Sequence, residues 1–374
     1  MITKKHPLLV SYLGTQREII SFHYGTPSIG EKIYIQASLH ADELPGMMVA
    51  HHLRQALAKL EADQQLHGEV VVVPVANPIG LGQTILRSQL GRFDAATGEN
   101  FNRHYPELFS AIKDSLASQL TSKEAENTKI VRAAMCAHLR ASTPRSELAS
   151  MRHVLMSLAC DADVVLDLHC DSDAVLHLYT GTPLWPQCEP LARAMGAHAT
   201  LLATESGDNP FDEACSQTWW QLASAFPSAP IAMACLAVTV ELRGQMDIDH
   251  DQAANDAQNI INFLIHRGVV SVAANAVSVL PALLHAATPL AGSEALEADV
   301  SGVVAFMRKP GETVKAGDLI AEVIDPISGA VKQFFCKTSG VLYARENRYF
   351  ATVGLRLAKV AGAKAFKTGN LLSA

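Results

Sequence analysis

The sequence is poor in charged side chains and has no long apolar run. Charged residues make up 18% and hydrophobic residues 49% of its 374 positions, whereas an average globular protein is about 25% charged. A composition this apolar excludes a chain that is disordered over most of its length. The longest apolar run, residues 231–242, contains Glu241 and is well short of the roughly 20 residues that cross a bilayer. We therefore expect a folded protein with no transmembrane helix and no membrane partner.

Signals for nucleic-acid binding, secretion and disulfide bonding are also missing. Thirty Lys and Arg residues against 37 Asp and Glu residues give a net charge of −7 without a basic block, so we expect no nucleic-acid partner. The apolar run at 8–13 is interrupted by Ser11 and precedes no small-residue cleavage site, so we expect no signal peptide. The seven cysteines form no Cys-x-x-Cys pair, which is typical of reduced thiols in a cytoplasmic protein.

The first 270 residues alternate between strand-like and helix-like segments. Four apolar runs are typical of buried strands in a mostly parallel sheet, namely residues 32–39, 69–75, 163–168 and 236–240. Helix-spaced apolar residues at 46–60 and 251–267 predict flanking helices, and the polar segment 106–149 predicts a helical insertion on the surface. We therefore expect residues 1–270 to form an α/β domain.

From about residue 271 the pattern changes to short strand-like runs separated by glycines. The length of the chain favours two domains, and this pattern predicts that the second, residues 285–374, is a small all-β domain. Within it, GETVKAGDLIAEV at 311–323 resembles the half-repeat of lipoyl and biotinyl domains. Lys332 lacks the neighbours of a modified lysine, so we favour a packing or covering role over a carrier role.

Histidine is frequent, at 15 residues, and two histidines stand at predicted strand ends. His40 ends the first strand and is followed by Glu43, and His169 ends the third. Imidazole and carboxylate are zinc ligands, and ligands bind at the carboxyl ends of such strands, so we predict His40, Glu43 and His169 as metal ligands. The same His-x-x-Glu pattern occurs at His104 and Glu107. These residues lie in a predicted loop that contains a proline, where no strand fixes the backbone. A buried, hydrogen-bonded core histidine is the alternative for His169.

Two carboxylates beside these motifs have predicted supporting roles. Glu241 follows the strand at 236–240, where burying it without a partner is costly, and metal-assisted hydrolysis needs a group that accepts a proton. We therefore predict Glu241 as the general base, with a structural salt bridge to Arg243 as the alternative. Asp167 precedes His169 by two residues and is a candidate for orienting that ligand.

Amide and guanidinium side chains lie between the first two metal motifs. They are Asn77, Arg87, Arg92, Asn102 and Arg103. Arginine binds a carboxylate through two parallel hydrogen bonds, so buried arginines in this region suit a substrate that carries a carboxylate. The alternative for Arg87 and Arg92 is that they are ordinary charged residues of the protein surface and bind no substrate.

In their order along the chain, these motifs resemble the succinylglutamate desuccinylase and aspartoacylase family, which is related to the zinc carboxypeptidases. The resemblance covers roughly residues 30–270 and rests on His40-x-x-Glu43, Asn77-Pro78, Asn102-Arg103 before Tyr105-Pro106, Asp167-x-His169 and Glu241. It implies a zinc-carboxypeptidase-like mixed central sheet flanked by helices, followed by a small barrel-sandwich, lipoyl-like β domain. It also implies hydrolysis of the amide bond of a small N-acyl amino acid or related amine.

The resemblance also implies roles for individual residues. A single zinc ion would be held by His40, Glu43 and His169, with Glu241 as the general base. The Asn102–Arg103 pair would bind a carboxylate of the substrate.

One further arginine, upstream of the Asn-Arg pair, polarises the scissile carbonyl in this family. Here Asn100-Phe101 stands where the family has Asp-Leu, after a longer insertion at 90–99, so Arg87 and Arg92 are both candidates. We favour Arg87 as the catalytic arginine because it keeps nearly the family's distance from Asn77-Pro78. Arg92 is then assigned to substrate binding.

Two other functions are compatible with the sequence. A zinc carboxypeptidase acting on short peptides would use the same site, and a non-enzymatic metal-binding or carrier protein would use the lipoyl-like domain. The motifs do not identify the acyl group or the amine, and sites of nitrogen and oxygen ligands bind several divalent ions. The apolar composition leaves room for a homo-oligomer interface.

Overall fold

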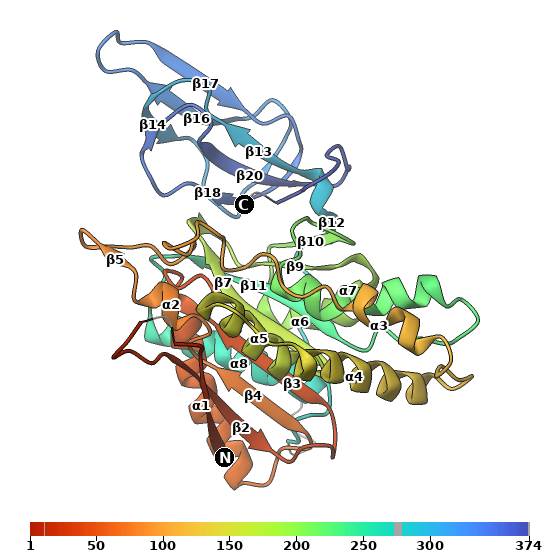
Figure 1. Cartoon of the computed structure of the whole chain (residues 1–374). Helices are drawn as coiled ribbons and strands as arrows, with labels where there is room; N and C mark the ends of the chain where they lie inside the picture. Colours follow the sequence, from red (N-terminus) through yellow and green to blue (C-terminus); the bar gives the residue numbers. More distant parts are fainter. Residues whose placement is uncertain (11, 273–278, 373–374) are drawn as a thin grey trace.

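The computed structural model describes residues 1–10, 12–272 and 279–372. Figure 1 shows a large α/β part, with helices on both sides of a twisted sheet, and a smaller all-β part formed by the end of the chain. No helix among the described residues combines the length and the apolar character that crossing a membrane requires.

The α/β part is built on one nine-stranded mixed sheet. In sheet order its strands are β1 (Ile2–Pro7), β2 (Glu18–Gly25), β4 (Glu69–Val73), β3 (Lys32–Ala37), β7 (Val164–Asp171), β11 (Leu236–Gly244), β9 (His177–Gly181), β10 (Ala199–Ala203) and β12 (Thr288–Pro289). The neighbours β4, β3, β7 and β11 run parallel to one another. The pairs β1–β2, β2–β4 and β9–β11 are antiparallel, and β10 is parallel to β9. The parallel centre therefore delivers several strand ends to one edge of the sheet.

Alternating side chains bury both faces of this sheet. On β3, Ile33 and Ile35 pack in one core with α1, α6 and α8, while Tyr34 packs in the opposite core with α3, α4, α5 and α7. The helices are α1 (Pro45–Ala62), α3 (Leu108–Leu116), α4 (Glu124–Ala141), α5 (Glu147–Ala159), α6 (Trp185–Met195), α7 (Phe211–Ala225) and α8 (His250–His266). The predicted helical segment 106–149 thus contains α3 and α4, which cover a face of the sheet.

The end of the chain forms two antiparallel sheets packed around small apolar cores. One contains β13 (Ser293–Glu297), β20 (Arg356–Gly362), β18 (Gly340–Arg345) and β15 (Thr313–Val314), and the other contains β17 (Val331–Phe335), β16 (Leu319–Ile324), β14 (Gly302–Phe306) and β19 (Phe350–Ala351). The predicted fold class, a mixed α/β sheet followed by an all-β part, is confirmed.

The two parts are joined by strand pairing as well as by the chain. The short strand β8 (Asp173–Ala174) of the α/β part pairs with β18, and Arg345 Nε donates to Asp173 Oδ2 at 2.7 Å. Strand β12, although within the predicted C-terminal range 285–374, pairs with β10 at the edge of the large sheet. These contacts hold the all-β part over the carboxyl ends of the central strands.

Candidate metal centre

The chain between β3 and α1 carries the first two predicted ligands. After β3 ends at Ala37, Ser38 adopts a left-handed conformation with φ of 63°, and the chain turns sharply into the loop that contains His40 and Glu43. Such strain in a residue other than glycine persists only where surrounding contacts stabilise it. The side chain of Asn77 provides one such contact, because its Nδ2 donates to the carbonyl oxygen of Leu39 at 2.8 Å.

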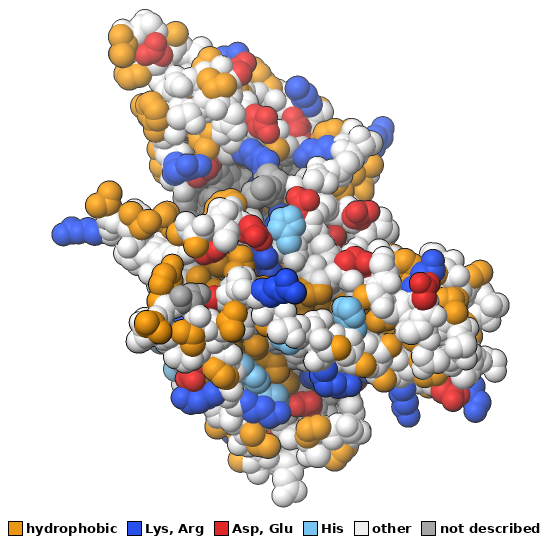
Figure 2. Space-filling view, in the orientation of Figure 1, with side chains coloured by type: hydrophobic (Ala, Val, Ile, Leu, Met, Phe, Trp, Pro, Cys, Tyr) orange, Lys and Arg blue, Asp and Glu red, His pale blue; other side chains and the backbone are white. Residues whose placement is uncertain are grey.

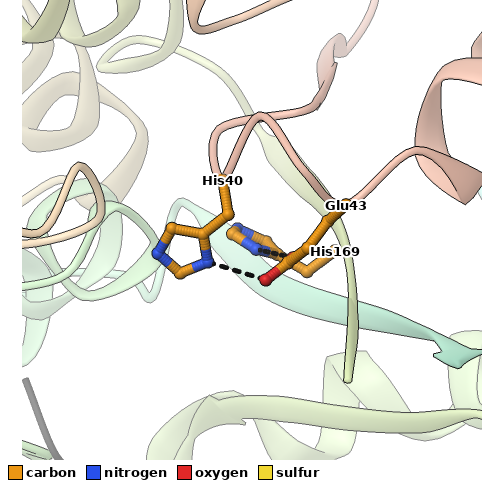
Figure 3. A group of neighbouring side chains, drawn as sticks. All are labelled: His40, Glu43 and His169. Atoms are coloured by element: carbon orange, nitrogen blue, oxygen red, sulfur yellow. Dashed lines mark hydrogen bonds and ion pairs between the residues drawn. The ribbon is translucent and has the colours of Figure 1, made fainter. Parts of the chain in front are cut away.

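The three predicted ligands converge at the carboxyl end of the parallel strands. In Figure 3 the side chains of His40 and His169 both point toward the carboxylate of Glu43. His40 Nδ1 lies 2.9 Å from Glu43 Oε1, and His169 Nδ1 lies 2.8 Å from Glu43 Oε2. One ligand atom from each residue falls within 4.8 Å of the other two, and the described residues contain no other such group of three.

The outer nitrogen of each imidazole is occupied by a side-chain oxygen. His40 Nε2 lies 2.9 Å from Asn100 Oδ1, and His169 Nε2 lies 3.0 Å from Asp167 Oδ2. With a cation bound, an oxygen beside Nε2 would favour the proton on that nitrogen and leave the lone pair of Nδ1 for the cation. Two neutral imidazole nitrogens and one carboxylate are a donor set that suits a divalent ion such as zinc.

The electrostatics of the group also favour a cation at its centre. Burial and the nearby Arg92 lower the pKa of His40 to about 4, so its imidazole is neutral. Burial acts to lower the pKa of His169, but Asp167 and Glu43 raise it well above the ordinary value. Burial acts to raise the pKa of Glu43, but the two histidines lower it well below the ordinary value. The two carboxylates thus favour a positively charged His169 beside Glu43, and a divalent ion at the same place would supply that positive charge instead.

Glu241 lies beside the group on the neighbouring strand. It pairs in register with His169, and its Oε2 is buried without a hydrogen-bond partner among the described residues. Burial, reinforced by the charge of Glu43, raises the pKa of Glu241 to about 8. The alternative partner, Arg243, turns away in a left-handed conformation and forms its ion pair with Asp256.

A cavity of about 490 Å³ opens from this group. Arg92, Asn102 and Arg103 line it with the three ligands and Glu241. Arg92 Nη1 lies 3.3 Å from Glu43 Oε1. Asn102 Oδ1 accepts from the backbone N–H of Phe211 at 2.8 Å, which holds the Asn-Arg segment against α7.

Other predicted residues lie outside this cavity. Arg87 stands at the tip of the hairpin between β5 (Thr84–Ile85) and β6 (Ser88–Gln89), where it is exposed and does not line the cavity. Glu107 accepts from the backbone N–H of Ser110 and caps α3, while His104 is exposed. The structure thus brings Arg92 to the ligands and leaves Arg87 and the second His-x-x-Glu motif apart from them.

Sequence reasoning missed one residue that contacts a predicted ligand and two residues that line the cavity. Asn100, which contacts His40, had a signal, because it replaces an aspartate of the resembling family. Lys359 and Tyr343 had none, since they come from the C-terminal sheet and reach the cavity only through packing. The Lys359 ammonium forms an ion pair with Asp171, two residues after His169.

Asp167→Asn is expected to weaken metal binding by about 10–100-fold. Gln36 Nε2 donates to Asp167 Oδ1, so an asparagine would turn its amide N–H₂ toward His169 and drive the imidazole proton onto Nδ1. Titration with a metal-chelating dye measures the change. Asp161→Asn, at the other end of β7 and paired with Lys32, should bind metal as the unaltered protein does; equal affinities in both variants would contradict the orienting role of Asp167.

Gly91→Ala is expected to displace the loop that carries His40 and Glu43. A Cβ atom at Gly91 would lie 2.0 Å from the backbone nitrogen of Asp42, and overpacking of this kind costs about 1–3 kcal/mol. We expect a lower melting temperature and weaker metal binding. Gly82→Ala, directly after the short helix α2 (Pro78–Leu81) and with its nearest contact at 3.5 Å, is the matched control, and unchanged metal affinity in Gly91→Ala would show that the loop tolerates the methyl group.

Comparison with known proteins agrees with the motifs. Residues 29–143 match the succinylglutamate desuccinylase/aspartoacylase catalytic domain. A solved structure from Shewanella amazonensis, described as a protein of that family, is 26% identical, with a TM-score of 0.83 over 96% of this chain and 98% of that one. A second, from Shewanella frigidimarina, is 25% identical, with a TM-score of 0.84 over 96% and 97%. No curated protein matches the sequence. The predicted resemblance to the family is confirmed.

Proposed function

From the confirmed resemblance to the succinylglutamate desuccinylase/aspartoacylase family, we propose that this protein is a zinc-dependent amidohydrolase that removes the acyl group from a small N-acyl amino acid or related amine. One observation carries the proposal. Two imidazole nitrogens and a carboxylate converge within 4.8 Å, and the unpartnered carboxylate oxygen of Glu241 faces the same cavity.

His40, Glu43 and His169 would hold the metal ion. Their donor atoms fit zinc in type and number, and catalytic zinc sites use three protein ligands and leave a position open. When bound, zinc supplies Lewis acidity for the amide carbonyl and a lower pKa for water. Asp167 and Asn100 keep the two imidazoles in the tautomer that binds a cation.

Glu241 is the proposed general base. Its buried Oε2 forms no hydrogen bond with described residues, so it can accept the proton of the attacking water and return it to the leaving amine. Burial and the charge of Glu43 raise the pKa of Glu241, which makes its carboxylate a stronger proton acceptor, and a metal cation beside it would favour the ionised form that the first step requires.

The cationic residues of the cavity would bind and polarise the substrate. We assign the polarising arginine to Arg92, since it lies beside Glu43 and Arg87 does not line the cavity. A guanidinium near the carbonyl oxygen stabilises the negative charge that develops there, which is usually the largest catalytic contribution. Asn102 and Arg103 are the proposed binding site for the substrate carboxylate.

The position of the C-terminal sheet favours a deacylase over the two alternatives. Alternate residues of β13 (Ser293, Ala295 and Glu297) line the cavity, so the sheet covers the site and favours small substrates over peptides. Lys332, the candidate carrier lysine, lies on β17 in an ion pair with Asp299 rather than at a hairpin tip. The free cysteines support a cytoplasmic location as a further part of the proposal.

Metal analysis followed by a substrate screen tests the proposal. We expect zinc to copurify with the protein and to be required for hydrolysis of N-acetyl or N-succinyl amino acids, with little hydrolysis of tripeptides. Faster hydrolysis of peptides would favour the carboxypeptidase. Bound metal without hydrolysis of either class would favour a non-enzymatic protein.

A further inference from the structure

One wall of the cavity carries two adjacent buried acids that the proposed mechanism does not use. Asp212 and Glu213 stand in the first turn of α7 and are only 8% and 7% exposed. Both line the cavity that contains His169 and Glu241. Buried carboxylates are normally paired with a cation, so these two residues require an explanation.

Arg103 lines the same cavity and interacts electrostatically with both acids, but neither acid forms a close ion pair within the described parts of the chain. Glu213 Oε2 is fully buried and has no hydrogen-bond partner there. Burial, followed by the charge of Asp167, raises the pKa of Asp212 to about 6, although Arg103 acts in the opposite direction. Burial and the charge of Asp212 raise the pKa of Glu213 to about 7. Arg103 and hydrogen bonds with Ser206 offset only part of the cost of burying the two carboxylates, so a further cation beside Glu213 Oε2 would stabilise their ionised forms.

Another part of the cavity wall has the opposite charge. Arg356, Lys359 and Lys367 of the C-terminal part line the same cavity. The pKa of Lys367 is lowered by burial and by the like charges of Arg356 and Lys359. In Figure 2, acidic and basic side chains gather along the seam between the C-terminal β sheets and the α/β part. The cavity thus carries both acidic and basic side chains in its lining, and can contact a cationic and an anionic group of one substrate.

We infer that the substrate carries a free ammonium group in addition to its carboxylate, as an N-acylated diamino acid does, and that Asp212 and Glu213 bind that ammonium group. The inference rests on the proposed deacylase function and specifies its substrate class. An ammonium group has three N–H donors and would give the buried Glu213 Oε2 a charge-assisted partner. A substrate without it would leave both carboxylates unpaired, and sites built around a polar group discriminate strongly against analogues that lack it.

Matched substrates test the inference directly. Nα-acetyl-lysine and N-acetyl-norleucine have the same carbon chain and differ in the terminal ammonium group. We expect kcat/KM to be higher for Nα-acetyl-lysine by about tenfold or more, and we expect Asp212→Asn and Glu213→Gln to bring the ratio of the two values toward one. Asp251→Asn, an exposed first-turn acid of α8 outside the cavity, should keep the full ratio.

Binding of the deacylated products gives a second measurement that does not depend on turnover. Lysine should stabilise the purified metal-loaded protein against heat more than norleucine does, and Glu213→Gln should remove that difference. Hydrolysis of both acetyl substrates at equal rates, or a preference that survives in Asp212→Asn and Glu213→Gln, would overturn the ammonium site and leave the deacylase function standing. Lack of hydrolysis of any N-acyl compound would instead contradict the proposed function itself; lysine binding that depends on Glu213 would still support the ammonium site.

Discussion

Glu241→Gln is expected to lower the turnover of an N-acyl amino acid by about 10³-fold and to leave the metal content unchanged. Glutamine has nearly the same shape as glutamate but cannot accept a proton from water. Glu241 lies outside the group of three ligands, so the substitution removes no metal donor. Steady-state kinetics and elemental analysis of the same preparation measure the two quantities.

The fold should tolerate this substitution. Burial and the charge of Glu43 disfavour the ionised form of Glu241, so a neutral amide relieves repulsion instead of creating it. Glu297→Gln, which makes the same chemical change elsewhere in the cavity lining, is the matched control and should retain activity. Full activity in Glu241→Gln would exclude Glu241 as the general base.

His169→Ala is expected to abolish stoichiometric metal binding. The variant keeps only two of the three donors, and it leaves the carboxylates of Glu43 and Asp167 without the imidazole that separates them. Removing one partner of a buried ion pair costs about 3–5 kcal/mol, so the melting temperature should also fall. Elemental analysis after dialysis measures the metal content.

His177→Ala separates the loss of a ligand from the loss of a core histidine. His177 is fully buried on β9, where its Nδ1 donates to the carbonyl oxygen of Val175 at 2.8 Å. It does not belong to the group of three ligands. We expect this control to lose stability and keep its metal. If His169→Ala still binds metal at the level of the unaltered protein, His169 is a core histidine and the ligand assignment fails.

The convergence of His40, Glu43 and His169 was predictable because the signals for these residues lie at the ends of predicted strands. His40 and Glu43 lie three residues apart at the end of an apolar strand, and His169 ends a second one, so the parallel register of β3 and β7 is enough to bring them together. The inference needs only the pairing of these two buried strands in one parallel sheet, which their apolar sequences favour.

Which of the two candidate arginines lines the cavity was not predictable in the same way. Counting residues from Asn77-Pro78 favoured Arg87, but the β5–β6 hairpin carries Arg87 outward. A bridge between Phe93 and Asn100 then brings the chain back, and with it Arg92. Distance along the sequence is a poor guide to position in space here. Residues added within a hairpin project outward, while the two ends of the hairpin stay close together.

The sequence by itself determined the fold class and the likeness to a zinc-dependent family, since apolar periodicity and strand-end motifs act over a few residues. Only the tertiary structure decided what surrounds those motifs. Asn100 and Asp167 orient the two imidazoles, and Lys359 reaches Asp171 across 188 residues of sequence. The acids of α7 line the same cavity as the cations of the C-terminal part. Such contacts depend on how separately formed elements pack, and no local pattern encodes that packing.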